Sequence, residues 1–86
     1  MHSGGESAEA NRRRIYMVLL DDPAREWTVR ALTAAVNTVG EGTVRDTFNR
    51  MLADGFLRPV PYRRALTAML TDHGKQSLTR LLRGVT

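Results

Sequence analysis

The fold prediction rests on the stretch from Thr43 to Leu57, TVRDTFNRMLADGFL. Its apolar residues recur with a period of about 3.6, which is the period of one helix face. The pattern predicts an amphipathic helix with Thr43 as its N-cap and Asp46 in a capping-box position, and Gly55 ends it. The apolar face is formed by Val44, Phe48, Met51 and Leu52.

A shorter helix precedes this stretch. Thr28 is a second N-cap candidate, and the helix that follows it ends near Asn37. Trp27 and Leu32 occupy the positions of a hydrophobic staple, so we expect Trp27 to be structural. Residues 38–42 form a turn with two glycines. Two short helices joined by such a turn form a helix-turn-helix, whose second helix lies in the major groove of DNA.

Helical periodicity stops after Gly55, and residues 56–60 and 64–70 are predicted to be two strands. In the second strand, Leu66, Ala68 and Leu70 are expected to share one face. Proline within or beside a strand indicates an edge, so the pattern predicts a small two-stranded ribbon. A further short strand is expected between the first and second helices. The bend between the strands is basic, and it carries Arg58, Tyr62, Arg63 and Arg64.

The outer parts of the chain predict a tail and two further helices. Residues 1–8 are expected to be a disordered tail, and residues 9–86 the domain. Ser7 is a candidate cap for a first helix that ends at residues 21–23, and Thr71 caps a last helix. Met17, Met51 and Met69 are expected to fill the core. One face of the last helix is a candidate homodimer surface, formed by Leu78, Leu81 and Leu82.

The composition narrows the class of partner. The 86 residues carry 13 Lys plus Arg against 9 Asp plus Glu, giving a net charge of +4, and 12 of the 13 cations are Arg. Arginine's planar donor fork suits phosphate and guanine, which favours nucleic acid; the competing explanation is the codon usage of a GC-rich genome. With no cysteine and no apolar run of about 20 residues, disulfides, thiolate metal sites and a membrane span are not expected. We therefore expect a cytoplasmic, nucleoid-associated protein with no metal or other cofactor.

Three stretches together resemble a known family. Residues 43–57 are similar to its recognition helix followed by L-x-x-x-G and two hydrophobic residues, and residues 70–78 to its L-T-x-x-G-x-x-x-L. Residues 27–32 resemble the segment that leads into its second helix. The chain thus resembles the winged helix-turn-helix domain of MarR-like and PadR-like bacterial regulators. The resemblance implies an α+β, mainly α, fold: a three-helix core with a small β-hairpin wing and a C-terminal helix.

The resemblance also implies roles for individual residues. The recognition helix, Thr43 to Asp54, would lie in the major groove, and the basic wing from Arg58 to Arg64 would follow the backbone or enter the minor groove. Tyr62 could pack on the wing or contact DNA. The base contacts would come from Arg45, Asp46, Asn49 and Arg50, and the phosphate contacts from Thr28, Arg30, Gly42 and Thr43.

Two functions from different classes follow from these patterns. The first is a sequence-specific regulator that binds double-stranded DNA as a homodimer on a palindromic site. The second is a winged-helix module for protein-protein interaction, or an accessory protein of DNA replication or partition. His73 next to Asp72 is expected to be a surface pair and no nucleophile motif is present, so we expect a non-enzyme with no small-molecule ligand and no membrane partner.

Overall fold

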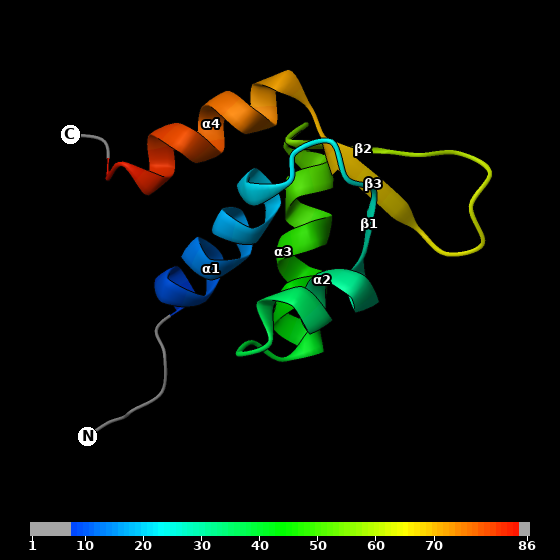
Figure 1. Cartoon of the computed structure of the whole chain (residues 1–86), viewed down its shortest axis with the longest axis horizontal. Helices are drawn as coiled ribbons and strands as arrows, with labels where there is room; N and C mark the ends of the chain where they lie inside the picture. Colours follow the sequence, from blue (N-terminus) through cyan, green and yellow to red (C-terminus); the bar gives the residue numbers. More distant parts are fainter. Residues whose placement is uncertain (1–7, 85–86) are drawn as a thin grey trace.

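The computed structural model describes residues 8–84. Ser7 and the rest of the predicted tail before Ala8 lie outside the described residues, and Ala8 itself begins the first helix. Helices dominate, and the short strands gather at one end (Figure 1). The elements in chain order are α1 (Ala8–Asp21), β1 (Trp27–Thr28), α2 (Val29–Val36), α3 (Glu41–Ala53), β2 (Leu57–Pro59), β3 (Thr67–Leu70) and α4 (Asp72–Leu82).

The sheet has three strands in the order β1-β3-β2, all antiparallel. The predicted ribbon is present as β2 and β3, and the short strand expected before the second helix is present as β1. The sequence analysis did not predict that β1 joins the ribbon, where Trp27 pairs with Ala68 and Thr28 with Thr67. Pro59 lies on the edge strand β2, as its missing N–H requires.

The strand β3 begins later than predicted, at Thr67. Leu66 belongs to the preceding loop, where strand alternation does not apply, and its side chain is 53% exposed. The expectation that it shares the inner face of the strand is wrong. Thr67 is buried, and its hydroxyl donates to the carbonyl of Ala65 (3.0 Å). Residues 60–66 are thus a loop, and this loop with β2 and β3 forms the wing.

One core joins all the helices to the sheet. Trp27 is 2% exposed within it, which confirms its structural role, and its neighbour Thr28 caps α2 by accepting the N–H of Ala31 (3.0 Å). Met51 is buried as expected, but Met17 is 58% exposed because α1 turns it outward. The remaining core residues are Ile15, Leu19, Leu32, Val36, Val39, Val44, Phe48, Leu57, Ala68, Leu70 and Leu78.

Helix α4 is held against the end of α3 by a close backbone contact. A Cβ on Gly74 would lie 2.1 Å from the carbonyl oxygen of Phe56, so only glycine fits there. Thr71 caps α4 by accepting the N–H of Gly74, and its own hydroxyl donates to the carbonyl of Gly55 (2.7 Å). This contact explains the L-T-x-x-G pattern, because its glycine, Gly74, lets the start of α4 pack directly on the backbone of Phe56.

The predicted dimer face on α4 is only partly exposed. Leu78 is fully buried in the core of its own chain, so it is excluded as a dimer contact. Leu82 is half-buried and Leu81 is 48% exposed. The spacing of three and four residues identified an apolar face of α4 correctly, but Leu78 of this face packs within the monomer.

Two further observations concern what the described part of the chain contains. None of its helices combines the length and the apolar character needed to cross a membrane. Among residues 8–84, no three His, Cys, Asp or Glu side chains gather in a way that could hold a metal ion.

Candidate nucleic-acid interface

Helix α3 presents a row of small and polar residues away from the core. Its buried side chains fix the orientation of the helix. At about 100° per residue, four positions then lie opposite the buried side. All four are exposed. We call this row the crest of α3, and it consists of Gly42, Asp46, Asn49 and Ala53.

The two arginines of α3 flank the crest on opposite sides. Arg45 and Asn49 line a groove on the side of the wing, whereas Asp46 and Arg50 line a smaller groove on the side of α1. The structure thus divides the four predicted base contacts into two pairs. Arg12 of α1 joins the second pair around its groove, which the sequence could not show because the two segments are far apart in the chain.

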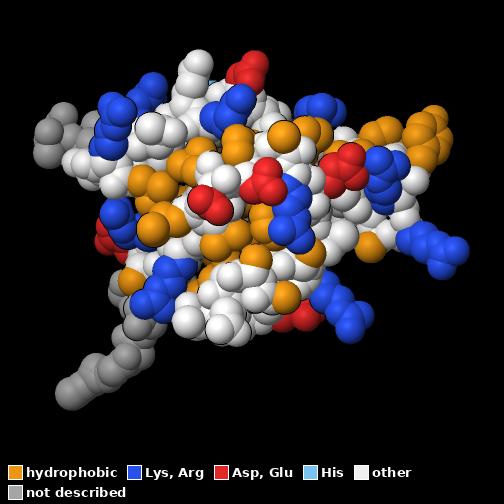
Figure 2. Space-filling model, in the orientation of Figure 1, with side chains coloured by type: hydrophobic (Ala, Val, Ile, Leu, Met, Phe, Trp, Pro, Cys, Tyr) orange, Lys and Arg blue, Asp and Glu red, His pale blue; other side chains and the backbone are white. Residues whose placement is uncertain are grey.

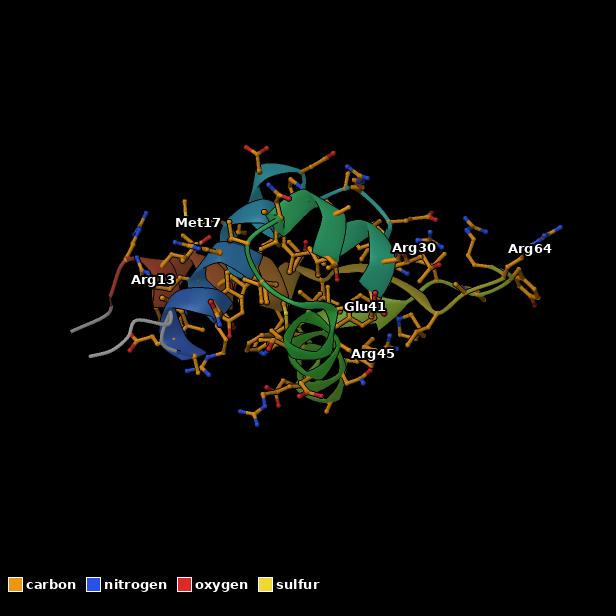
Figure 3. All side chains as sticks on the ribbon, turned by 90° about the horizontal axis from the view of Figure 1, so that it is seen from below. Arg13, Met17, Arg30, Glu41, Arg45 and Arg64 are labelled. Atoms are coloured by element: carbon orange, nitrogen blue, oxygen red, sulfur yellow. The ribbon has the colours of Figure 1, made fainter. Side chains whose placement is uncertain are left out.

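The groove on the wing side brings together three separate parts of the chain. It has a volume of about 380 Å³, and its walls come from the start of α2, one side of α3 and the loop of the wing. Figure 3 shows Arg30, Glu41 and Arg45 on this side of the molecule, with Glu41 between the two arginines. The groove is lined by Thr28, Val29, Arg30, Glu41, Arg45, Asn49, Ala65 and Leu66.

The N-cap of helix α3 lies three residues earlier than predicted. This N-cap is Gly40, in extended conformation and without a side-chain hydrogen bond, so the capping box of Thr43 and Asp46 is wrong. Val39 is buried and anchors the turn just before this point. The first helical hydrogen bond runs from the N–H of Val44 to the carbonyl of Gly40 (3.1 Å). Gly42 and Thr43 therefore lie in the first turn, where N–H groups attract anions.

Glu41 pairs with Arg45 one turn later in α3. Both side chains are 53% exposed, so the pair is a solvated surface contact that contributes little to stability. Its effect is on direction, because it holds the guanidinium of Arg45 beside the groove. Because the pair is solvated, exchanging the carboxylate for another acceptor costs little.

The wing is tied to the segment before β1 by a two-point ion pair. Arg63 Nε and Nη2 donate to the two carboxylate oxygens of Glu26 at 2.9 and 3.1 Å. The hydrogen bond with Arg63 lowers the pKa of Glu26, and the same contact raises the pKa of Arg63. Arg63 is therefore engaged within the chain, whereas the sequence grouped it with the free cations of the wing.

The other predicted wing residues differ in how they are held. Tyr62 is 97% exposed with a φ of 64°, so its ring does not pack on the wing, and the alternative of wing packing is wrong. Arg58 Nη2 contacts Met69 Sδ at 3.4 Å. Arg64 extends from the far end of the wing (Figure 3). Tyr62 and Arg64 are thus the groups at the tip that face solvent.

Among the solved structures that match, TubR shares this architecture over the full length of this chain. TubR, a type III plasmid segregation protein, matches with a TM-score of 0.64 at 16% sequence identity, and the match covers 100% of this chain and 94% of TubR. At this identity the likeness shows the fold, a winged helix-turn-helix. No family model matches the chain, and no curated protein matches it.

Proposed function

We propose that this protein binds double-stranded DNA with sequence preference, through the crest of α3 and the groove between α3 and the wing. The observation that carries this proposal is the shared groove. It places Arg30 at the start of α2, Arg45 on α3 and the wing loop around one concave surface. Such a surface offers the guanidinium groups of Arg30 and Arg45 to the phosphate backbone of DNA from two helices, and the wing loop closes its third side.

The crest suits the major groove, which is about 12 Å wide and admits one helix. Gly42 and Ala53 keep the crest low, so the backbone of α3 can approach the base edges. Asn49 can make two hydrogen bonds with adenine, and Asp46 can accept from the amino group of cytosine. Arg45 and Arg50 would contact guanine or phosphate on either side of the crest.

Positioning on the duplex would come from the flanking elements. The first-turn N–H groups of Gly42 and Thr43 and the exposed Arg30 are placed for phosphate oxygens. Arg64 and Tyr62 at the tip of the wing would contact the backbone or minor groove. These contacts add affinity without distinguishing sequences. We assign Arg63 to holding the wing in place.

The biological setting of this binding has two candidates. A regulatory role follows from the MarR-like and PadR-like resemblance of the sequence. A role in plasmid segregation is supported by the structural likeness to TubR. In both, the protein acts by binding and not by catalysis, and it needs no cofactor. Plasmid loss in a strain that lacks the protein supports segregation, and changed transcription near its binding site supports regulation.

The test of DNA binding is a selection of bound sequences from random duplex DNA. We expect a motif to be enriched by the wild type, and no motif to be enriched when Arg45 and Arg50 are both replaced by Ala. The same variant should keep its far-UV circular dichroism, because both side chains are exposed. If the folded wild type enriches nothing, the proposal fails and the winged helix serves protein-protein interaction.

A further inference from the structure

The exposed side of α1 carries a charge pattern that DNA binding does not use. Glu9, Arg13, Met17 and Asp21 follow each other at intervals of four residues and form one oblique row on the helix surface. All four are exposed, and Met17 is 58% exposed although it is apolar. The row reads acid, base, apolar, acid along the chain.

This row is complementary to itself when it is reversed. Arg13 lies four residues before Met17 and Asp21 four residues after it, so an antiparallel copy places each Arg13 opposite the other chain's Asp21. The alternation continues at the outer ends. Glu9 precedes Arg13 in the row. At the other end, Arg25 follows Asp21 and lines a hollow of about 400 Å³ together with Met17 and Asp21.

We propose that α1 is a docking surface for a second copy of this chain, with the two α1 helices antiparallel and Met17 at the twofold axis. A twofold contact is isologous, so the one Arg13–Asp21 contact occurs twice. The apolar Met17 pair between them is covered from water.

The surroundings of the row suit such a contact. Leu81 of α4 is 48% exposed and lines a hollow together with Glu9, Arg13 and Tyr16, so apolar surface continues beside the row. Figure 2 shows hydrophobic side chains gathered where α1 and α4 meet on this face, with charged groups around them. Arg13 is also oriented by its donation to the carbonyl of Leu82 (3.2 Å).

This arrangement leaves the proposed DNA-binding surface open. Met17 and Arg45 lie on opposite sides of the molecule (Figure 3). A twofold axis within the interface reverses the outward direction, so the two α3 crests of the pair point away from each other. The pair would then hold two duplex segments instead of two half-sites of one palindrome. This last consequence rests on the proposed DNA binding, whereas the pairing itself does not.

The test is sedimentation equilibrium of charge-reversal variants, without DNA. A contact made mainly by one helix of each chain is small for a protein interface and therefore weak, so protein at about 100 µM is suitable. We expect Arg13→Asp and Asp21→Arg each to weaken the wild-type dimer more than about tenfold, because each creates two like-charge contacts. The double variant R13D/D21R restores the complementary row and should dimerise again.

Mixing the two single variants gives the sharpest result. One chain then carries Asp at both positions and the other Arg at both, so we expect a heterodimer although neither variant dimerises alone. The control is Arg64→Asp, which makes the same charge change away from α1 and should dimerise like the wild type. A monomeric wild type, single variants that dimerise normally, or a mixture without heterodimer overturns the proposal. Circular dichroism of each variant confirms that it is folded.

Bridging is measured separately, by the capture of a free labelled duplex on beads that carry the same duplex. We expect the wild type to capture it and Arg13→Asp to bind the beads without capture. If the protein binds no duplex at all, the proposed function fails and the dimer result still stands. If the wild-type dimer binds DNA without capture, the outward arrangement of the crests is wrong.

Discussion

The two exposed faces of this molecule differ in how their charges are arranged. The face of α3 and the wing presents Arg30, Arg45 and Arg64 around one groove and the tip beyond it. The α1 row instead alternates in sign about Met17. An excess of one sign suits a polyanion such as DNA, whereas an alternating row suits a copy of itself. Total charge alone does not separate these two uses.

The largest expected effect comes from variants that change only the DNA-binding face. Replacing Arg45 and Arg50 by Ala should remove about 2 to 6 kcal/mol of discrimination between the selected site and random duplex, since each good base contact contributes about 1–3 kcal/mol. The measurement is fluorescence anisotropy with both duplexes at one salt concentration. Dimerisation through α1 should not change. Unchanged discrimination would show that the crest of α3 does not contact bases.

The next effect weakens the scaffold that carries both faces. Gly74→Ala forces a Cβ into the carbonyl of Phe56, and such overpacking lowers the free energy of unfolding by about 1–3 kcal/mol. The matched control is Gly42→Ala, where an added Cβ meets nothing within 4 Å. That change should raise the stability by about 0.5–1 kcal/mol, because alanine favours a helix. Urea denaturation measures both, and equal effects would contradict the close contact of α4.

A smaller effect separates the two neighbouring arginines of the wing. Arg64→Ala should remove one phosphate contact, which reduces the slope of log affinity against log salt by about 0.9. Arg63→Ala loses its contact with Glu26 instead. We expect it to leave that slope nearly unchanged while loosening the wing, seen as faster amide exchange in residues 60–66. Equal changes in the two salt slopes would show that Arg63 contacts DNA directly.

The smallest expected effect is on the loss of stability at acid pH. The contact with Arg63 depresses the pKa of Glu26 below its ordinary value of 4.5. A group with a depressed pKa stabilises the fold above its ordinary pKa, and this contribution is lost as pH falls through the lower, folded value. Glu26→Gln should therefore narrow the stability difference between pH 5 and about pH 3, by a small amount because the pair is exposed. An unchanged pH profile would mean that the pair is not formed in solution.

Local patterns predicted the helices because each helix has a period and an end signal of its own. Thr28, Thr71 and the apolar face of α3 behave as their sequence context indicates. The pairing of the short strand β1 with the ribbon was missed, and the predicted start of α3 and the predicted dimer role of Leu78 were wrong. Each depends on contacts between distant segments, such as Trp27 with Ala68, which no local period contains.

The candidate site was predicted in part for the same reason. Its arginines on α3 and the wing were visible as a basic pattern, but their division into two grooves depends on the rotation of α3. The pairing of Arg63 with Glu26 joins residues 37 positions apart, and the exposure of Met17 depends on how α1 packs. Both needed the folded structure.

The most direct measurement of the central claim is an amide chemical-shift titration of the labelled protein with its selected duplex. We expect the largest changes at residues 28–30, at 41–50 and at the wing loop 60–66, which surround the crest and its groove. Residues 13–21 should change little, because they lie on the other face. Changes concentrated on α1, with α3 unaffected, would contradict the account.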